Sequence, residues 1–138
     1  MAFFRRIEDF FQRPPANSVN FSDAEKELRR KQLLEDFGPF TYTEDGFLFQ
    51  TADRSESVKW TDIEQVVAFK LDRLTYDLIC LRLFWLEGDL LITEDEPGWY
   101  PFTERLNAAL PVAKNWEATV AQPPFETSET LVYLKDFL

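Results

Sequence analysis

Short apolar runs divided by polar turns dominate the middle of the chain. Runs of Val, Ile, Leu, Phe and Trp of this length, separated by turn residues such as Gly88-Asp89, predict an antiparallel β-meander rather than helices. We expect a strand over residues 58–71 with a break at Thr61-Asp62, and another over residues 90–94. The run 78–86 between them is apolar on both faces, as in a strand that is covered on both sides.

A hairpin is expected before this meander. Residues 40–43 and 47–50 alternate apolar and polar positions and flank Asp45-Gly46. A type I′ turn needs positive φ at its two central residues, which Asp and Gly tolerate, so this pair predicts a tight hairpin with that turn.

Two helices are predicted ahead of the hairpin. In the first 13 residues, apolar side chains recur at helical spacing until Pro14-Pro15. That apolar stripe consists of Phe3, Phe4, Ile7, Phe10 and Phe11. A second helix should begin at Ser22, where Ser22-Asp23-Ala24-Glu25 has a capping-box pattern, and end near Phe37, before Gly38. We interpret the mixed charges on its outer face as solvated.

The pattern becomes helical again after Gly98. Pro101 suits the first position of a helix, and Pro111 would end it. The apolar face of this helix would carry Phe102, Leu106, Ala109 and Leu110. A further short helix is predicted from the i, i+4, i+8 repeat of Val112, Trp116 and Val120. Residues 130–135 form either a last strand or an ordered arm.

Length and composition indicate a single domain over residues 1–138. With 138 residues and 45% hydrophobic content, the chain can build one core but not two. Residues 1–37 would form an N-terminal helical segment, and residues 38–138 the β-meander with C-terminal helices and a tail. The expected class is α+β, with a strongly bent antiparallel sheet that forms a roll or barrel and is capped by the helix that follows it.

The charge balance narrows the choice of partner. The 25 acidic and 15 basic residues give a formal charge of −10. A protein with this negative charge repels phosphate backbones and anionic lipid and attracts basic proteins, which argues against nucleic acid as a ligand. No run approaches the roughly 20 apolar residues of a membrane-spanning helix, and the N-terminus has no signal-peptide core. Because Cys80 is the single cysteine, we expect a reducing, cytoplasmic location.

No catalytic or cofactor motif occurs in the sequence. Without histidine there is no ready acid–base group at neutral pH, and no Ser-His or Cys-His nucleophile can be assembled. Cys80, inside an apolar run, is expected to be a small buried hydrophobe. Glu94-Asp95-Glu96 lacks the converging oxygens that Ca²⁺ or Mg²⁺ requires, so we expect these carboxylates to cap the following helix. We therefore predict no catalytic residue, no metal and no cofactor.

Three charged residues near the first turn of the meander have two interpretations. If Lys70 and Asp72 close a strand beside Asp77, they would form a local ion network that fixes the turn, worth about 0 to 1 kcal/mol if exposed. Alternatively, Lys70 is a polar hot spot on a binding edge. We prefer the structural interpretation.

The four tryptophans divide between packing and surface roles. Trp60 and Trp116 are interpreted as packing residues, whereas Trp85 and Trp99 lie beside acidic residues and turns and suit a partner-facing surface. No basic residue occurs between Trp85 and Glu104, so the local field is strongly negative. The predicted partner-binding residues are Trp85, Glu87, Asp89, Glu94, Asp95, Glu96 and Trp99.

Short motifs spaced over residues 47–133 carry a family resemblance. They are VKWTDI at 58–63, AFKLD at 68–72, TYDLI at 75–79, ITEDEPGW at 92–99, Leu110-Pro111, Trp116 and PFE at 124–126. Together they resemble small uncharacterised bacterial proteins with a pleckstrin-homology-like fold. The resemblance implies that fold and a non-enzymatic binding role, and some acidic proteins of this pattern resemble the cytosolic immunity partners of secreted toxins. It does not extend to the N-terminal helices.

Three classes of function remain open. The best supported is a cytosolic protein-binding module that grips a basic protein with its acidic surface, in the manner of an immunity protein that masks a toxin. The alternative is a membrane-surface adaptor whose amphipathic helix, residues 3–11, lies on lipid. Packing of that helix on the sheet, or on a second subunit of a homo-oligomer, fits its weak positive charge better. A hydrolase working through carboxylates is the least supported.

Overall fold

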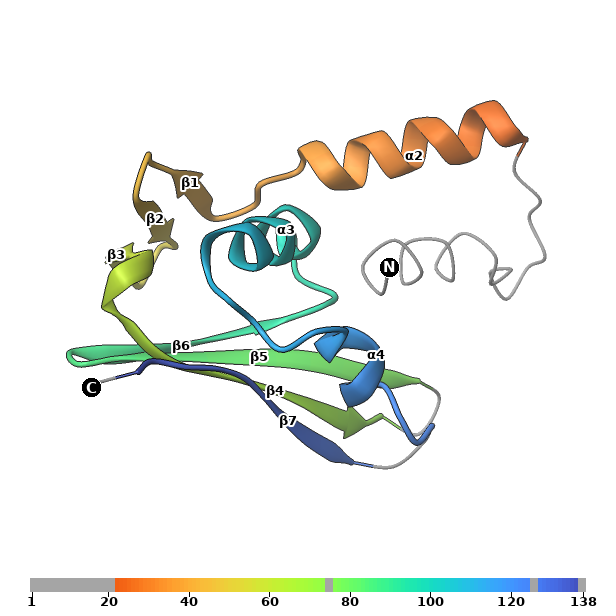
Figure 1. Ribbon diagram of the computed structural model, residues 1–138. Helices are drawn as coiled ribbons and strands as arrows, with labels where there is room; N and C mark the ends of the chain where they lie inside the picture. The colour runs from red at the N-terminus through yellow and green to blue at the C-terminus, as the bar shows by residue number, and fades with distance from the viewer. Residues whose placement is uncertain (1–21, 74–75, 125–126, 137–138) are drawn as a thin grey trace.

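The computed structural model describes residues 22–73, 76–124 and 127–136, which contain seven strands in two antiparallel sheets (Figure 1). The class is α+β, as predicted. The strands form a sheet of three and a sheet of four rather than one sheet, and these are not closed into a barrel. The predicted helix with the apolar stripe from Phe3 to Phe11 lies outside the described residues.

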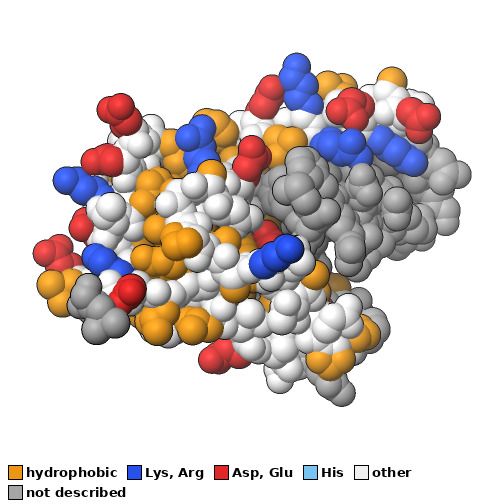
Figure 2. Space-filling view, in the orientation of Figure 1, with side chains coloured by type: hydrophobic (Ala, Val, Ile, Leu, Met, Phe, Trp, Pro, Cys, Tyr) orange, Lys and Arg blue, Asp and Glu red, His pale blue; other side chains and the backbone are white. Residues whose placement is uncertain are grey.

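Helix α2 (Asp23–Glu35) begins where the capping pattern places it, because the Ser22 hydroxyl accepts the Glu25 N–H at 3.2 Å. The helix ends two residues earlier than predicted, with Asp36 as its C-cap. Acidic and basic side chains mix on its exposed surface (Figure 2), which confirms a solvated charged face. Helix α2 contacts helix α3 (Trp99–Ala109), and its Leu33 and Leu34 belong to the same apolar cluster as Tyr100 of α3.

The small sheet contains β1 (Phe40–Tyr42), β2 (Gly46–Gln50) and β3 (Ser55–Lys59) in that order. The β1–β2 hairpin is confirmed, but the type I′ turn was a wrong prediction, because neither Asp45 nor Gly46 has positive φ. Gly46 is needed for a different reason. A Cβ there would lie 2.1 Å from the Val58 carbonyl oxygen of the neighbouring strand β3.

The large sheet contains β4 (Ile63–Asp72), β5 (Asp77–Trp85), β6 (Gly88–Thr93) and β7 (Ser128–Leu134) in the order β6-β5-β4-β7. A short 3₁₀ helix, η1 (Trp60–Asp62), separates β3 from β4 at the predicted break. Strands β4, β5 and β6 are consecutive antiparallel neighbours, so the meander is confirmed. The C-terminal segment is a strand that pairs with β4.

Helices α3 (Trp99–Ala109) and α4 (Trp116–Val120) lie on one side of the large sheet (Figure 1). Gly98, at φ 92°, is the N-cap of α3, so Pro101 is the third helical residue and not the first. Proline is tolerated there because the first four N–H groups of a helix have no intrahelical partner. Phe102 and Leu106 face the core as predicted, whereas Ala109 is exposed.

One apolar core joins both sheets and both C-terminal helices. The Phe102 ring lies 4.7 Å from Phe40 and 5.2 Å from Phe47, between centroids, and so connects α3 to the small sheet. Trp116 is 1% exposed, and its indole N–H donates to Asn107 Oδ1 at 2.9 Å. Trp60 packs against the same core, so both predicted packing tryptophans are confirmed.

Candidate functional site

The two faces of the large sheet differ in how they are covered. Successive side chains of a strand point to opposite faces, and Val66, Leu81 and Ile92 identify the inner face because they are buried in the core. Helices α3 and α4 and the small sheet all lie on this inner side (Figure 1). The opposite side, which we call the outer face, has no covering element among the described residues.

Apolar side chains dominate the outer face. The pairing registers assign to it Gln65, Val67, Phe69 and Leu71 of β4, Leu78, Cys80, Arg82 and Phe84 of β5, Asp89, Leu91 and Thr93 of β6, and Glu129, Leu131 and Leu134 of β7. Of the eight large apolar residues that are most exposed in the described chain, four belong to this face. They include Leu91 at 47%, Leu131 at 48% and Leu134 at 59%. Because exposed apolar side chains often gather at interaction surfaces, the outer face is the candidate site.

Cys80 is a buried position of the outer face. Cys80 lies in register between Phe69 and Thr93, and it is only 1% exposed. Burial raises the pKa of the Cys80 thiol to about 11, although the charge of Arg73 acts in the opposite direction. A thiol whose pKa is raised in this way is protonated at neutral pH, and its burial confirms the prediction of a small buried side chain.

Carboxylates border the outer face. Asp89 Oδ2 accepts the Arg82 Nε–H at 2.8 Å, and Thr93 Oγ1 donates to Asp95 Oδ1 at 2.5 Å and to Glu96 Oε1 at 3.2 Å. Because Thr93 belongs to the outer face, these bonds hold Asp95 and Glu96 at its border. We define the acidic rim as Glu87, Asp89, Asp95, Glu96 and Glu129.

The seven predicted partner-binding residues do not lie together in one region of the surface. Asp89 and Glu94 are five residues apart along β6, or about 17 Å at strand rise, so the acidic residues lie at both ends of that strand. Glu94 continues the sheet pairing: its N–H donates to the Ile79 carbonyl at 2.9 Å, and its Oε1 accepts the Ile79 N–H at 3.0 Å.

Three predictions about this region need correction. Trp99 is 4% exposed in the core, because the turn at Gly98 directs it inward, so it is not a partner-facing residue. Trp85 is half-buried and packs against the core rather than on the outer face. The carboxylates of residues 94–96 do not cap α3, whose N-cap makes no side-chain hydrogen bond.

Both edges of the large sheet carry contacts that oppose the addition of a further strand. The Arg54 guanidinium donates to the Asp89 carbonyl oxygen on β6. On β7, the Val132 carbonyl, at a bulge in the pairing with β4, accepts the Ala113 N–H at 2.7 Å. Proteins protect exposed strand edges with bulges and covering groups of this kind. Within the described chain, the outer face is therefore the open surface of this sheet.

Lys70 lies on the inner side of the sheet, 1% exposed. Its Nζ is 3.4 Å from Asp77 Oδ2 and donates to the carbonyl oxygens of Ala121, at 2.9 Å, and Pro123. Of the predicted ion network of Lys70, Asp72 and Asp77, the Lys70–Asp77 pair is present, with a buried lysine and an aspartate that is 20% exposed. The hot-spot interpretation was wrong, because no partner can reach this ammonium group. The two carbonyls, 51 and 53 residues away, could not be read from the sequence.

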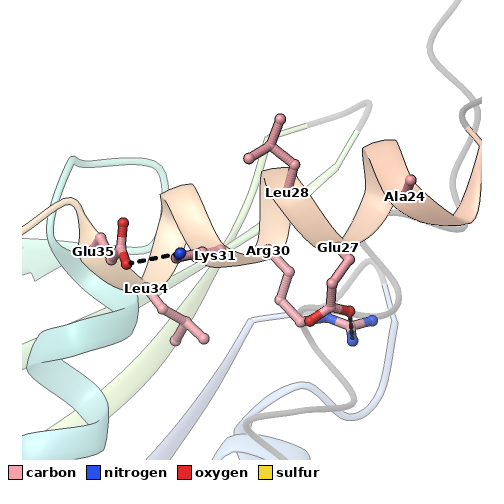
Figure 3. Close-up of a pocket in the computed structure, with 7 residues that line it drawn as sticks. All are labelled: Ala24, Glu27, Leu28, Arg30, Lys31, Leu34 and Glu35. Carbon is pink, nitrogen blue, oxygen red and sulfur yellow. Dashed lines mark hydrogen bonds and ion pairs between the residues drawn. The ribbon is translucent and has the colours of Figure 1, made fainter.

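A hollow along α2 does not form a convergent site. Leu28 and Leu34 project to opposite sides of the helix (Figure 3). The charged residues that line the hollow form ion pairs along the helix, Arg30 with Glu27 at 3.1 Å and Lys31 with Glu35 at 4.0 Å. The described residues also contain no group of three or more Cys, Asp or Glu side chains placed to hold a metal ion.

No helix among the described residues is long and apolar enough to cross a membrane. Comparison of the chain with protein-family models, with curated proteins and with solved structures found no significant match.

Proposed function

We propose that this chain is a non-enzymatic protein-binding module and that it binds its partner with the outer face and the acidic rim. One observation carries the proposal: apart from Arg82, the core of β5 is apolar on both sides, but described elements cover only its inner side. Strands of that composition are normally covered on both faces. Leu91 and Leu131, each about half exposed, are the residues that a partner would shield from water.

Charge supports a basic partner. The acidic rim contributes five carboxylates, whereas Arg82 is the basic residue of the outer face and is already paired with Asp89. A second copy of the chain, with its formal charge of −10, would bring two such rims together at a repulsive cost. A partner with Lys or Arg around an apolar patch would instead be attracted and captured faster.

The size of the outer face suggests how much of the module the partner covers. Four strands about 4.8 Å apart and a central strand of nine residues make a face of about 500 Å². A standard interface buries about 800 Å² on each partner. The partner therefore covers the acidic rim as well as the leucines.

The resemblance to small bacterial proteins with a pleckstrin-homology-like fold belongs to the same proposal. The six strands that precede α3, and the buried face of that helix, are compatible with such a roll. An immunity-type role in the cytoplasm would give the module a basic toxin as its partner, with the acidic rim masking the toxin's cationic surface.

Charge insertion on the outer face tests this function. The tagged full chain and its Leu131→Asp, Leu91→Asp and Leu28→Asp variants are expressed in the source cells, and co-purifying proteins are compared by quantitative mass spectrometry. Leu28, on α2, is 56% exposed and serves as the matched control for Leu131 at 48%. We expect one basic protein to be lost from both outer-face variants and kept by Leu28→Asp. Equal recovery by all four chains, with unchanged melting temperatures, would refute the proposal.

A further inference from the structure

Arg82 occupies the centre of the outer face. It lies in register between Leu91 of β6 and Val67 of β4, and Leu131 of β7 continues the same row. We infer that Arg82 is the specificity-determining contact of this surface and that it binds an acceptor on the partner, either a carboxylate or a main-chain carbonyl. The inference rests on the proposed function and names the chemistry at its centre.

Asp89 fixes the orientation of this guanidinium without saturating it. Arg82 Nε and Nη2 both approach Asp89 Oδ2, at 2.8 and 2.7 Å, and the guanidinium carbon lies 5.5 Å from the centre of the Phe84 ring. A guanidinium has five N–H donors in a rigid plane. One carboxylate oxygen engages two of them, and the side chain remains 49% exposed. The other donors are therefore oriented and accessible to a ligand.

When a partner covers the outer face, the remaining N–H groups of Arg82 lose water as their hydrogen-bond acceptor. While the face is open, water satisfies them. Once apolar surface closes over Val67 and Leu91, a charged donor without an acceptor would carry a large desolvation cost. A partner that supplies an acceptor instead gains a charge-assisted hydrogen bond inside a ring of apolar contacts. Arginines at the centre of such rings are typical interface hot spots.

Loss of the Arg82 charge changes the affinity for a basic partner in opposite directions, depending on whether net charge or the local hydrogen bond dominates. Removing a positive charge from an acidic protein should, by charge alone, strengthen its binding to a basic partner. Loss of Arg82 should weaken that binding, because the acceptor on the partner would be buried without a donor. Lys114, exposed in the loop before α4, provides the matched removal of a charge away from the face.

The test uses the full chain and, as probe, the purified protein recovered with the wild-type chain and lost from Leu131→Asp. Dissociation constants are measured by surface plasmon resonance at fixed salt for Arg82→Met, Arg82→Lys, Asp89→Asn and Lys114→Met. We expect Arg82→Met to weaken binding about 30-fold or more and Arg82→Lys about 10-fold, because an ammonium lacks the planar fork. Asp89→Asn should weaken it less, and Lys114→Met should leave it equal or tighter.

The melting temperatures of these variants separate recognition from folding. An ion pair this exposed contributes little to stability, so Arg82→Met should melt close to the wild type. Suppose that Leu131→Asp abolishes binding but Arg82→Met binds as tightly as the wild type or more tightly. This result would refute the role of Arg82 without refuting the outer face as the binding surface. If no protein depends on Leu131, the proposed function fails and this inference fails with it.

Discussion

The Lys70→Met substitution tests the buried ion network most sharply. Methionine keeps the length and most of the volume of the lysine stem, so the cavity term is small. The change removes the charge that faces Asp77 and the donor that serves the carbonyls of Ala121 and Pro123. These carbonyls lie in the connection from α4 to β7, so the substitution also loosens the attachment of that connection to β4.

The expected magnitude follows from the burial of both partners. Removing one member of a buried ion pair typically costs about 3 to 5 kcal/mol, because the other charge stays buried without compensation. The Asp77 side chain is 20% exposed, so water compensates part of its charge and the lower end applies. A loss of about 3 kcal/mol is a large share of the 5 to 15 kcal/mol typical of a domain. It should lower the melting temperature by roughly 10 °C.

Urea unfolding of the full chain at neutral pH measures this cost. Lys135→Met is the control, because the Lys135 ammonium also donates to a main-chain carbonyl, that of Thr61 at 2.9 Å, but does so at the surface. It should cost less than about 1 kcal/mol. The double variant Lys70→Met/Asp77→Asn should recover about 1 to 2 kcal/mol by removing the carboxylate charge that no longer faces an ammonium group at residue 70. A Lys70→Met protein as stable as Lys135→Met would refute the reasoning.

Three further substitutions or reactions have defined outcomes. Trp99→Ala should destabilise the fold by about 3 to 5 kcal/mol, because it empties a core site; urea unfolding that shows a loss below 1 kcal/mol would contradict its burial. Reversing Asp95 and Glu96 to Lys should slow association with the proposed basic partner several-fold and weaken the salt dependence of the association rate. Surface plasmon resonance across a salt series measures both, and unchanged rates would show that the acidic rim has no role in recognition. Cys80 should react with a thiol reagent at pH 8 only after unfolding, because its thiol is buried with a pKa of about 11; rapid labelling of the native chain would contradict this.

The local pattern of hydrophobic and polar residues predicts most of the helices and strands in the described part of the chain. The break at Thr61-Asp62 interrupts the period of two, and the 3₁₀ helix lies there. The residue types at Asp45-Gly46 predict the hairpin but not the reason why residue 46 is glycine. Glycine is needed there because β3 approaches closely, and this tertiary contact cannot be predicted from turn preferences.

The hydrophobic pattern of the sequence contains a signal for the proposed binding surface, but the distribution of acidic residues and tryptophans points elsewhere. The apolar run 78–86 predicts a strand that is covered on both sides, whereas the described elements cover only its inner side. The density of acidic residues instead favours a partner-binding surface that includes residues 94–96 and an exposed Trp99. The turn at Gly98 buries that tryptophan, and Glu94 is used by Ile79. Arg82 became a candidate only when the strand register placed it among apolar neighbours.

Site-specific photo-crosslinking in the source cells tests the central claim most directly. A photoreactive phenylalanine analogue replaces Leu91, Leu131 or Leu28, one at a time, in the full chain, and adducts are identified by mass spectrometry. The proposed module predicts that positions 91 and 131, on opposite edge strands of the outer face, both capture the same basic protein, and that position 28 does not. Adducts to that protein from position 28 alone, or no adduct from either outer-face position, would contradict it.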